Sequence, residues 1–262
     1  MSRTIFITGA TGGFGQAFAQ KFWVMKDIGG APYNFILHGR DEAKIDHVIS
    51  TLPDLAPHQR LHKMVADLTN TTDLQAALDA IPQEFKDIDL LINNAGLALG
   101  LEPAHRTDLK DWHTMIDVND KALVTITHHV LPQMVERQSG HIINIASTAA
   151  NYPYPGGNVY CASKAFVKHF SLALRADLHG SGVRVTSLEP GMAETNFSVL
   201  RFKGDEAQAK KVYEGMTPLS GEDVANAAHF VFSQAPHVNI NRMEIMPTAQ
   251  SFAAHPIART TE

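Results

Sequence analysis

The 262-residue chain contains one cysteine, Cys161, so it can form no disulfide within itself. This composition suits a reducing compartment, and we expect a cytoplasmic protein. No apolar run reaches the ~18 residues of a membrane-spanning helix, which predicts no membrane partner. The N-terminal stretch enters a glycine-rich turn before the apolar region of a signal peptide could build up.

The chain also lacks a basic surplus and a metal-ligand pattern. Its formal net charge of −5 gives no electrostatic reason to expect a nucleic-acid partner. There are 14 histidines, but His58 and His62 flank an expected strand, and the adjacent His128 and His129 point to different helix faces. Because no third ligand stands at a recognisable spacing, we expect no metal site.

What the chain does contain is a regular alternation of apolar and amphipathic segments. Apolar runs rich in β-branched residues, typical of buried strands, lie at residues 4–8, 33–38, 61–66, 88–92, 141–146, 183–188 and 240–245. Segments of helical period lie at residues 16–26, 74–80, 109–137, 160–178 and 221–233. This alternation predicts an α/β fold, with seven strands in a doubly wound parallel sheet that is covered on both faces. Since no linker or repeat divides it, we expect a single domain over residues 1–262.

In such sheets ligands bind at the carboxyl ends of the strands, where the winding reverses. The first expected strand runs into residues 8–15, TGATGGFG, and glycine lets a backbone approach a phosphate closely. A helix that starts near Gly13 would aim free N–H groups at a pyrophosphate. Taken alone, this motif fits an ordinary turn between a strand and a helix equally well.

The end of the second expected strand bears on which dinucleotide would bind. Gly39 stands where an NAD site of this fold places a carboxylate for the ribose diol, and Arg40 follows it. A guanidinium suits a ribose 2′-phosphate, which a carboxylate would repel. We therefore predict NADP(H) as the cofactor. The alternative is that Arg40 begins a solvated helix beside Asp41 and Glu42.

Two further strand ends carry weaker signals. Asp67 could accept a hydrogen bond from an adenine amino group, or it could cap the next helix. Residues 93–96, Asn-Asn-Ala-Gly, suit a backbone that passes close to a ribose, and they also suit a plain turn.

Four polar residues form a candidate catalytic set. Tyr160 and Lys164 are four apart on an expected helix and so share a face. A neighbouring ammonium should lower the pKa of a phenol, which is about 10 when unperturbed, so that Tyr160 could exchange a proton near neutral pH. Ser147 ends the fifth expected strand, where its hydroxyl could hold a substrate oxygen beside Tyr160. Asn119 is an unexpected polar residue inside a long helical segment.

Each member of this set also has an ordinary interpretation. A Tyr/Lys pair at this spacing is usually helix surface. Ser147 suits a helix or turn cap, and Asn119 suits a solvated amide.

Together, these motifs and Pro190-Gly191 resemble the short-chain dehydrogenase/reductase family from end to end. The resemblance implies a Rossmann-type domain in which Tyr160 is the acid–base and Ser147 polarises the substrate carbonyl. Lys164 would bond the nicotinamide ribose, Asn119 would hold a proton-relaying water, and a homotetramer is implied. The implied cofactor-binding residues are Thr8, Gly9, Thr11, Gly13, Phe14, Gly15, Arg40, Asp67, Leu68, Asn93, Ala95, Gly96, Tyr160, Lys164, Pro190, Gly191 and Thr195.

A narrower resemblance concerns the substrate. Residues 94–105, 156–160, 201–205 and 237–241 look like bacterial NADP-dependent 3-hydroxy acid dehydrogenases that also oxidise serine, and the sulfoacetaldehyde reductases are similar to the same group. It implies an oxidoreductase that interconverts a short anionic hydroxy compound and its aldehyde or ketone. One alternative is a sulfoacetaldehyde reductase that forms isethionate, and a remote one is a non-catalytic NADP-binding sensor.

The anionic head group needs a binding partner near the catalytic pair. Residues 192–213 are expected to form a lid over the substrate, and Arg201 within it could bind a carboxylate or sulfonate with two hydrogen bonds. Tyr152 and Asn158 are further candidate donors. Alternatively, Arg201 and Lys203 are solvated charges at a subunit contact.

Overall fold

The structure, a computed structural model, describes residues 3–26 and 29–252. The strands in these ranges form one parallel seven-stranded sheet of order β3-β2-β1-β4-β5-β6-β7. The two ends of the expected domain lie outside the described residues. The strands are β1 (Thr4–Ile7), β2 (Asn34–Gly39), β3 (Leu61–Val65), β4 (Ile88–Asn93), β5 (Gly140–Ile145), β6 (Val183–Pro190) and β7 (Arg242–Ile245). Because the winding reverses between β1 and β4, the crevice opens at the carboxyl ends of these two strands. The doubly wound sheet expected from the sequence is confirmed.

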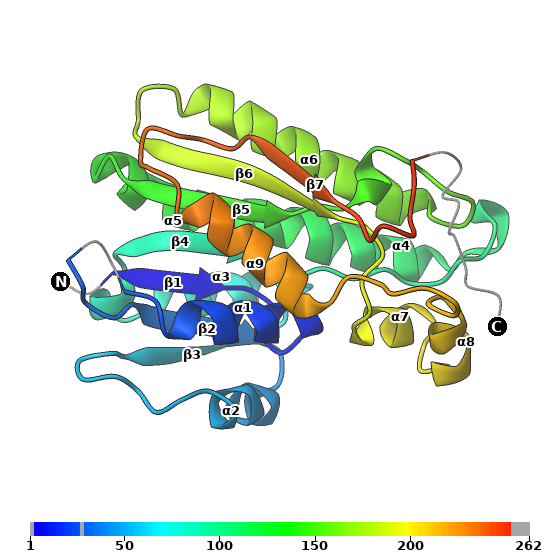
Figure 1. Cartoon of the computed structure of the whole chain (residues 1–262), viewed down its shortest axis with the longest axis horizontal. Helices are drawn as coiled ribbons and strands as arrows, with labels where there is room; N and C mark the ends of the chain where they lie inside the picture. The colour runs from blue at the N-terminus through cyan, green and yellow to red at the C-terminus, as the bar shows by residue number, and fades with distance from the viewer. Residues whose placement is uncertain (1–2, 27–28, 253–262) are drawn as a thin grey trace.

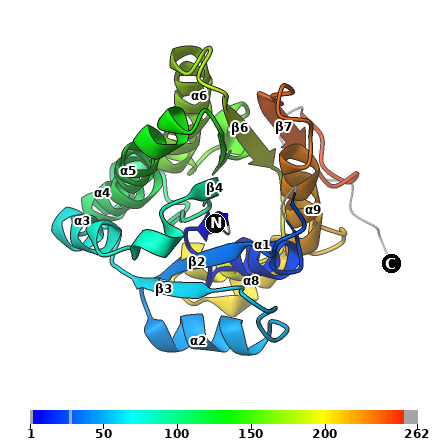
Figure 2. The ribbon, with the colours of Figure 1, turned by 90° about the vertical axis from the view of Figure 1, so that its left-hand side faces the viewer.

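Helices cover both faces of this sheet (Figures 1 and 2). On one face lie α1 (Gly13–Trp23), α2 (Glu42–Ser50) and α9 (Gly221–Phe232), whose apolar side chains share a core with β1 and β2. On the other face lie α3 (Thr71–Asp79), α5 (Ala122–Glu136) and α6 (Asn158–Asp177), which form a second core. The strands read as unbroken apolar runs because the sheet is buried on both sides.

The segment 109–137, expected to be one helix, is divided in three. It consists of α4 (Leu109–Ile116), a π-helical turn (Asp117–Lys121) and α5. Two consecutive residues of this turn, Val118 and Asn119, are buried. Such π-helical turns often occur at functional sites.

Helix α2 has nine residues, of which Ile45 and Val48 are buried, and it was expected from the sequence only as the alternative reading of Arg40. Asp41 caps this helix by accepting a hydrogen bond from the Lys44 N–H, so Arg40 lies just before the helix. Segment 192–213 contains two short helices, α7 (Asn196–Arg201) and α8 (Glu206–Lys211), which lie beyond the carboxyl ends of the strands (Figure 1).

Within the described ranges, no helix combines the length and the apolar character needed to span a bilayer. The same part of the chain shows no group of three or more His, Cys, Asp or Glu side chains placed to hold a metal ion.

Candidate active site

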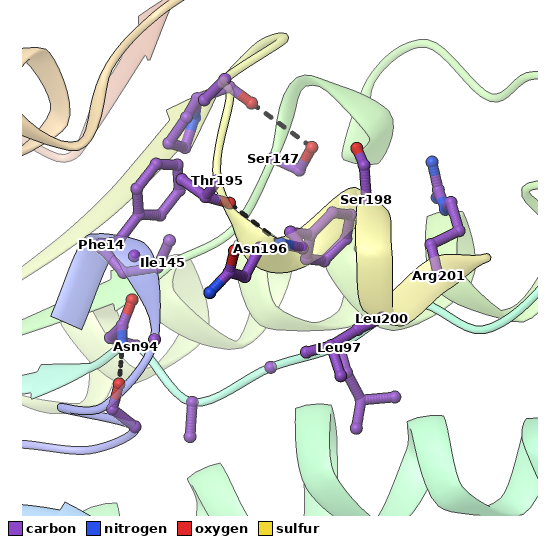
Figure 3. A pocket seen from close by; sticks show the side chains of 18 of the residues that line it. Phe14, Asn94, Leu97, Ile145, Ser147, Thr195, Asn196, Ser198, Leu200 and Arg201 are labelled. Atoms are coloured by element: carbon purple, nitrogen blue, oxygen red, sulfur yellow. Dashed lines mark hydrogen bonds between the residues drawn. The ribbon is translucent and has the colours of Figure 1, made fainter. Parts of the chain in front are cut away.

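A cavity of about 520 Å³ opens at the carboxyl ends of the central strands, beneath α7. Most of the residues expected at the site line it: Gly9, Thr11, Gly13, Phe14, Arg40, Leu68, Ala95, Gly96, Ser147, Tyr160, Lys164, Pro190, Gly191, Thr195 and Arg201. Seven others do not: Thr8, Gly15, Asp67, Asn93, Asn119, Tyr152 and Asn158. Figure 3 shows Phe14 and Asn94 at one end of this cavity and Arg201 at the other.

The glycine loop and the start of α1 form the end suited to phosphates. Gly9 has a φ of +63°, and a Cβ on Gly15 would lie 2.1 Å from the Gly9 carbonyl oxygen, so both positions require glycine. Among the described residues, no side chain caps α1 at Gly12, and its first turn holds no acid. The free N–H groups and the positive helix end therefore face the cavity. This cradle fits a dinucleotide pyrophosphate.

His38, which the sequence analysis did not single out, supports this loop from β2. Its Nδ1 accepts a hydrogen bond from the Gly9 N–H at 3.1 Å, and its Nε2 lies 3.2 Å from the Ala66 carbonyl oxygen. These partners require a neutral ring that carries its proton on Nε2. Burial lowers the pKa of His38 from 6.5 to about 4, so the ring stays neutral at physiological pH. The only sequence signal was one polar residue at the end of an apolar strand.

Thr8 and Asn94 fasten the glycine loop to the end of β4. Thr8 Oγ1 accepts hydrogen bonds from the N–H groups of Asn94 and Ala95, both at 3.0 Å. In return, Asn94 Nδ2 donates to the carbonyl oxygens of Thr8 and Gly9. Thr8 therefore acts from outside the cavity, by fixing the two loops that border it.

Asp67 and Asn93 bond within the protein rather than facing the cavity. Asp67 accepts hydrogen bonds from the N–H and the hydroxyl of Thr69, which lower the pKa of its carboxyl. It does not cap α3, because Asn70 does. Asn93 Nδ2 donates to Thr127 and Asn144.

Three catalytic candidates reach the cavity from two elements, α6 and the end of β5. Tyr160 and Lys164 are 9% and 5% exposed on α6, and both reach the cavity as their spacing predicted. Ser147 follows β5, where its hydroxyl accepts from the Ala149 N–H at 3.1 Å and thus also caps a short turn. The Lys164 ammonium donates to the Ile145 carbonyl oxygen at 2.8 Å. A substrate oxygen placed between Ser147 and Tyr160 would meet two hydroxyl groups.

The electrostatics of this pair differ from the prediction. Burial raises the pKa of Tyr160, and the charge that opposes this effect is Arg201, followed by a hydrogen bond from Ser147. Lys164, expected to lower that pKa, has its own pKa reduced by burial from 10.5 to about 8. A buried amine with a lowered pKa can take up and release protons near neutral pH.

Asn119 is not a solvated amide, because it is 1% exposed and fully bonded. Its Nδ2 donates to the Leu97 carbonyl oxygen and to Ser163 Oγ, and its Oδ1 accepts from the Leu97 N–H. A Cβ on Gly96 would lie 3.1 Å from Lys164 Nζ and 3.3 Å from Asn119 Oδ1. The Asn119 and Lys164 side chains therefore both lie close to Gly96, where a larger residue would crowd them.

Comparison with known proteins agrees with this geometry. Residues 3–205 match the family described as short chain dehydrogenase. The chain belongs to this family. It is therefore an oxidoreductase that acts on a CH–OH group.

Individual members of the family match this dehydrogenase over nearly its whole length. A serine 3-dehydrogenase of Rhizobium radiobacter is 47% identical over 99% of each chain. An NADP-dependent 3-hydroxy acid dehydrogenase of Salmonella typhi is 47% identical over 98% of this chain and 99% of its own. Sulfoacetaldehyde reductase 2 of Chromohalobacter salexigens is 45% identical over 99% and 100%. The closed form of a serine dehydrogenase complexed with NADP+ is 46% identical over 98% and 100%, with a TM-score of 0.87.

In this dehydrogenase, α7 carries a cation into the cavity. The Arg201 guanidinium lies 5.0 Å from the ring centre of Tyr160, 5.4 Å from that of Phe197 and 5.5 Å from that of Tyr154. It donates a hydrogen bond to the Tyr154 hydroxyl, while its Nε is buried with no hydrogen-bond partner among the described residues. Lys203 instead lies outside the cavity and pairs with Asp111 at 2.8 Å.

Two of the three expected substrate donors lie elsewhere. The Tyr152 hydroxyl lies 3.4 Å from a Glu244 carboxylate oxygen, and Asn158 Oδ1 accepts from the Val159 N–H. Tyr154 and Gln250 line the cavity in their place, and Gln250 Oε1 accepts from the Met192 N–H at 2.8 Å. No sequence signal separates Tyr154 from Tyr152 in an irregular loop, or brings Gln250 to a site 58 residues away along the chain.

Proposed function

We propose that this dehydrogenase uses NADP(H) to interconvert a short anionic hydroxy compound, of the 3-hydroxy acid or serine type, and its aldehyde or ketone. The observation that supports this proposal most directly is Arg201, a cation that lines the cavity with its guanidinium 5.0 Å from the ring centre of Tyr160. The names of the serine and 3-hydroxy acid dehydrogenases to which the chain is similar support the same substrate class.

Tyr160 is the acid–base of the proposed reaction. In reduction its hydroxyl gives a proton to the carbonyl oxygen, and in oxidation its phenolate takes one from the substrate hydroxyl. The bound cofactor supplies or accepts the hydride. Ser147 orients the substrate oxygen toward Tyr160 and hydrogen-bonds to the charge that grows on it. Lys164 keeps a positive charge near the pair when it is protonated.

The preference for NADP(H) is supported at the end of β2. Arg40 is exposed at the cavity, where a guanidinium could bind the 2′-phosphate of the adenosine ribose. The preceding position has little room for an acid. A Cβ on Gly39 would lie 3.0 Å from Thr11 Cγ2 and 3.1 Å from Ile45 Cγ1.

Arg201 is the proposed ligand of the substrate anion. A carboxylate or sulfonate in the cavity would share the guanidinium with Tyr154, because Arg presents several donors in one plane. Losing a charge-assisted hydrogen bond costs about 1.5–3 kcal/mol. We therefore expect Arg201→Ala to raise KM for anionic substrates by about 10- to 100-fold and to leave neutral substrates almost unaffected.

Steady-state kinetics with malonic semialdehyde, sulfoacetaldehyde and neutral propionaldehyde test this proposal, and L-serine tests the reverse direction. Lys203→Ala is the matched control, since it removes a cation from the same segment outside the cavity. Equal losses on anionic and neutral aldehydes would place Arg201 in lid packing. A higher kcat/KM for sulfoacetaldehyde than for malonic semialdehyde would select the sulfonate alternative, which the likeness to sulfoacetaldehyde reductase 2 supports.

We further propose that the enzyme is a homotetramer. Leu109, Ile116 and Phe166 on α4 and α6 are 59%, 38% and 43% exposed, and Phe166 stacks on Phe170 with ring centres 5.8 Å apart. An apolar face of this kind suits pairing with a second copy. A monomer mass by light scattering at micromolar concentration would refute the assembly.

A further inference from the structure

The segment that carries Ser147 is connected to the end of β6 at two places. The Ser147 hydroxyl accepts from the Ala149 N–H and donates to the Pro190 carbonyl oxygen at 3.4 Å. Asn151, which follows the short 3₁₀ helix Thr148–Ala150, donates from Nδ2 to Glu189 Oε2 at 2.7 Å. Because Glu189 directly precedes Pro190 in β6, both hydrogen bonds hold the same two segments together.

The same Asn151 side chain also reaches the helix that carries Tyr160. Its Oδ1 accepts a hydrogen bond at 2.6 Å from Lys168 Nζ, and Lys168 lies further along α6 from Tyr160. On the other side, its Nδ2 donates to Glu244 Oε2 on β7 at 2.6 Å. One amide therefore joins the segment after β5 to β6, β7 and α6, although it does not itself line the cavity.

Charged side chains of both signs surround this amide, and they are Glu189, Glu244, Lys168 and Arg242. Glu189 is fully buried, and Arg242 donates to its two carboxylate oxygens at 2.8 and 2.7 Å. Burial acts to raise the pKa of Glu189, but the hydrogen bonds that it accepts from Arg242, Asn151 and Ser187 outweigh burial and lower this pKa. An amide suits the position because it can donate to two carboxylates and accept from two cations, whereas a carboxylate could not donate.

We propose that Asn151 is a positioning residue that acts through Ser147, by holding the Ser147 hydroxyl at a fixed place relative to Tyr160. The proposal rests on the proposed role of Ser147 in orienting the substrate oxygen. Ser147 and Tyr160 come from separate elements, so the distance between their hydroxyls depends on the contacts that join these elements. Asn151 supplies such contacts to α6 through Lys168 and to β6 through Glu189. A catalytic donor that is displaced by about 1 Å can cost up to ~100-fold in rate.

Asn151→Ala removes these hydrogen bonds and should lower kcat by about 10-fold, through misplacement of the Ser147 hydroxyl. The KM for malonic semialdehyde should stay almost unchanged, because the proposed anion ligand Arg201 lies on α7. The Kd of NADPH should also stay unchanged, since the glycine loop is not altered. Asn151→Asp keeps the shape of the side chain but cannot donate to Glu189 when it is ionised, so it should show a similar loss of kcat.

A double-mutant cycle with Ser147→Ala distinguishes positioning from a general effect on the fold. Ser147→Ala alone should lower kcat by about 100-fold. If Asn151 acts through the Ser147 hydroxyl, adding Asn151→Ala should lower kcat by less than about 2-fold further, because residues that act as a unit are not additive. A further 10-fold loss in this background, or wild-type kcat in Asn151→Ala alone, would overturn the proposal. Wild-type kcat in Ser147→Ala would refute the proposed role of Ser147 itself, and the positioning role with it.

The matched control is Asn239→Ala, which removes another amide that binds β6. Asn239 donates to the Val185 carbonyl oxygen at 2.9 Å and accepts from the Val185 N–H at 2.8 Å. Val185 lies toward the amino end of β6, away from Pro190. This variant should therefore keep wild-type kcat even where its Tm falls, and a 10-fold loss of kcat in it would show that loosening β6 anywhere has the same effect, which would refute the specific role of Asn151.

A milder variant, Lys168→Met, keeps the proposal testable if circular dichroism shows that Asn151→Ala does not fold. It removes only the contact between Asn151 and α6. We expect it to lower kcat by a smaller factor than Asn151→Ala, with KM unchanged, and to have no effect once Ser147 has been replaced by Ala. An unchanged kcat in Lys168→Met, or the same loss with and without the Ser147 hydroxyl, would refute the positioning role.

Discussion

The buried His38 should make the stability of this enzyme depend on pH in a way that one substitution removes. The pKa of His38 is lowered from 6.5 to about 4 in the folded protein. A group whose folded pKa is depressed binds fewer protons when folded, so its contribution is present above pH 6.5 and is lost as the pH falls toward 4. Each pH unit within this window costs about 1.36 kcal/mol.

The expected magnitude follows from the width of the window. Between pH 7.5 and pH 5, which includes 1.5 units of this window, the wild type should lose about 2 kcal/mol of unfolding free energy through His38 alone. His38→Asn is the matched variant, because the Asn Oδ1 can still accept the Gly9 N–H and does not titrate. We expect it to lose about 2 kcal/mol less than the wild type over the same interval.

Urea unfolding at pH 7.5 and pH 5.0, at one protein concentration, measures this difference. Other buried histidines, such as His141, titrate in both proteins and cancel in the comparison. The exposed His237→Asn should follow the wild type. Binding of NADPH, measured by fluorescence at both pH values, should weaken more in the wild type than in His38→Asn, since protonated His38 cannot accept the Gly9 N–H. Equal losses of stability in the wild type and His38→Asn would refute the assigned tautomer and its role under the glycine loop.

The remaining predictions concern catalysis and the cofactor. Tyr160→Phe should lower kcat by at least ~100-fold while NADPH binding stays almost unchanged, and wild-type turnover would contradict the acid–base assignment. Arg40→Ala should weaken NADPH binding by about 10- to 100-fold and leave NADH binding nearly unaffected, because NADH has no 2′-phosphate to lose its charge-assisted hydrogen bonds. Equal losses for both cofactors in a fluorescence titration would make Arg40 structural.

The sequence by itself determined the sheet and the chemical groups of the site. The strands could be predicted because strands that are buried on both faces are continuous apolar runs in the sequence. All seven predicted strands appear in the structure. The glycine loop could be predicted because its geometry leaves no room for a side chain at Gly9 and Gly15, so glycine has to appear at these positions of the sequence. Tyr160 and Lys164 were paired by helix geometry alone, which places residues four apart on one face.

Only the tertiary structure decided how those groups are surrounded. The sequence offers Arg201 as the anion ligand but leaves open that it is a solvated charge like Lys203, and the fold decides this by turning Arg201 into the cavity and pairing Lys203 with Asp111 on the surface. The sequence likewise gives no reason for Asp120 to differ from Asp117, yet burial raises the pKa of Asp120 to about 7, whereas Asp117 pairs with Lys121 on the same turn. A pKa depends on the solvent and charge around a group, and these come from residues far apart in the chain. The identity of a catalytic side chain is therefore local information, whereas its protonation state belongs to the folded molecule.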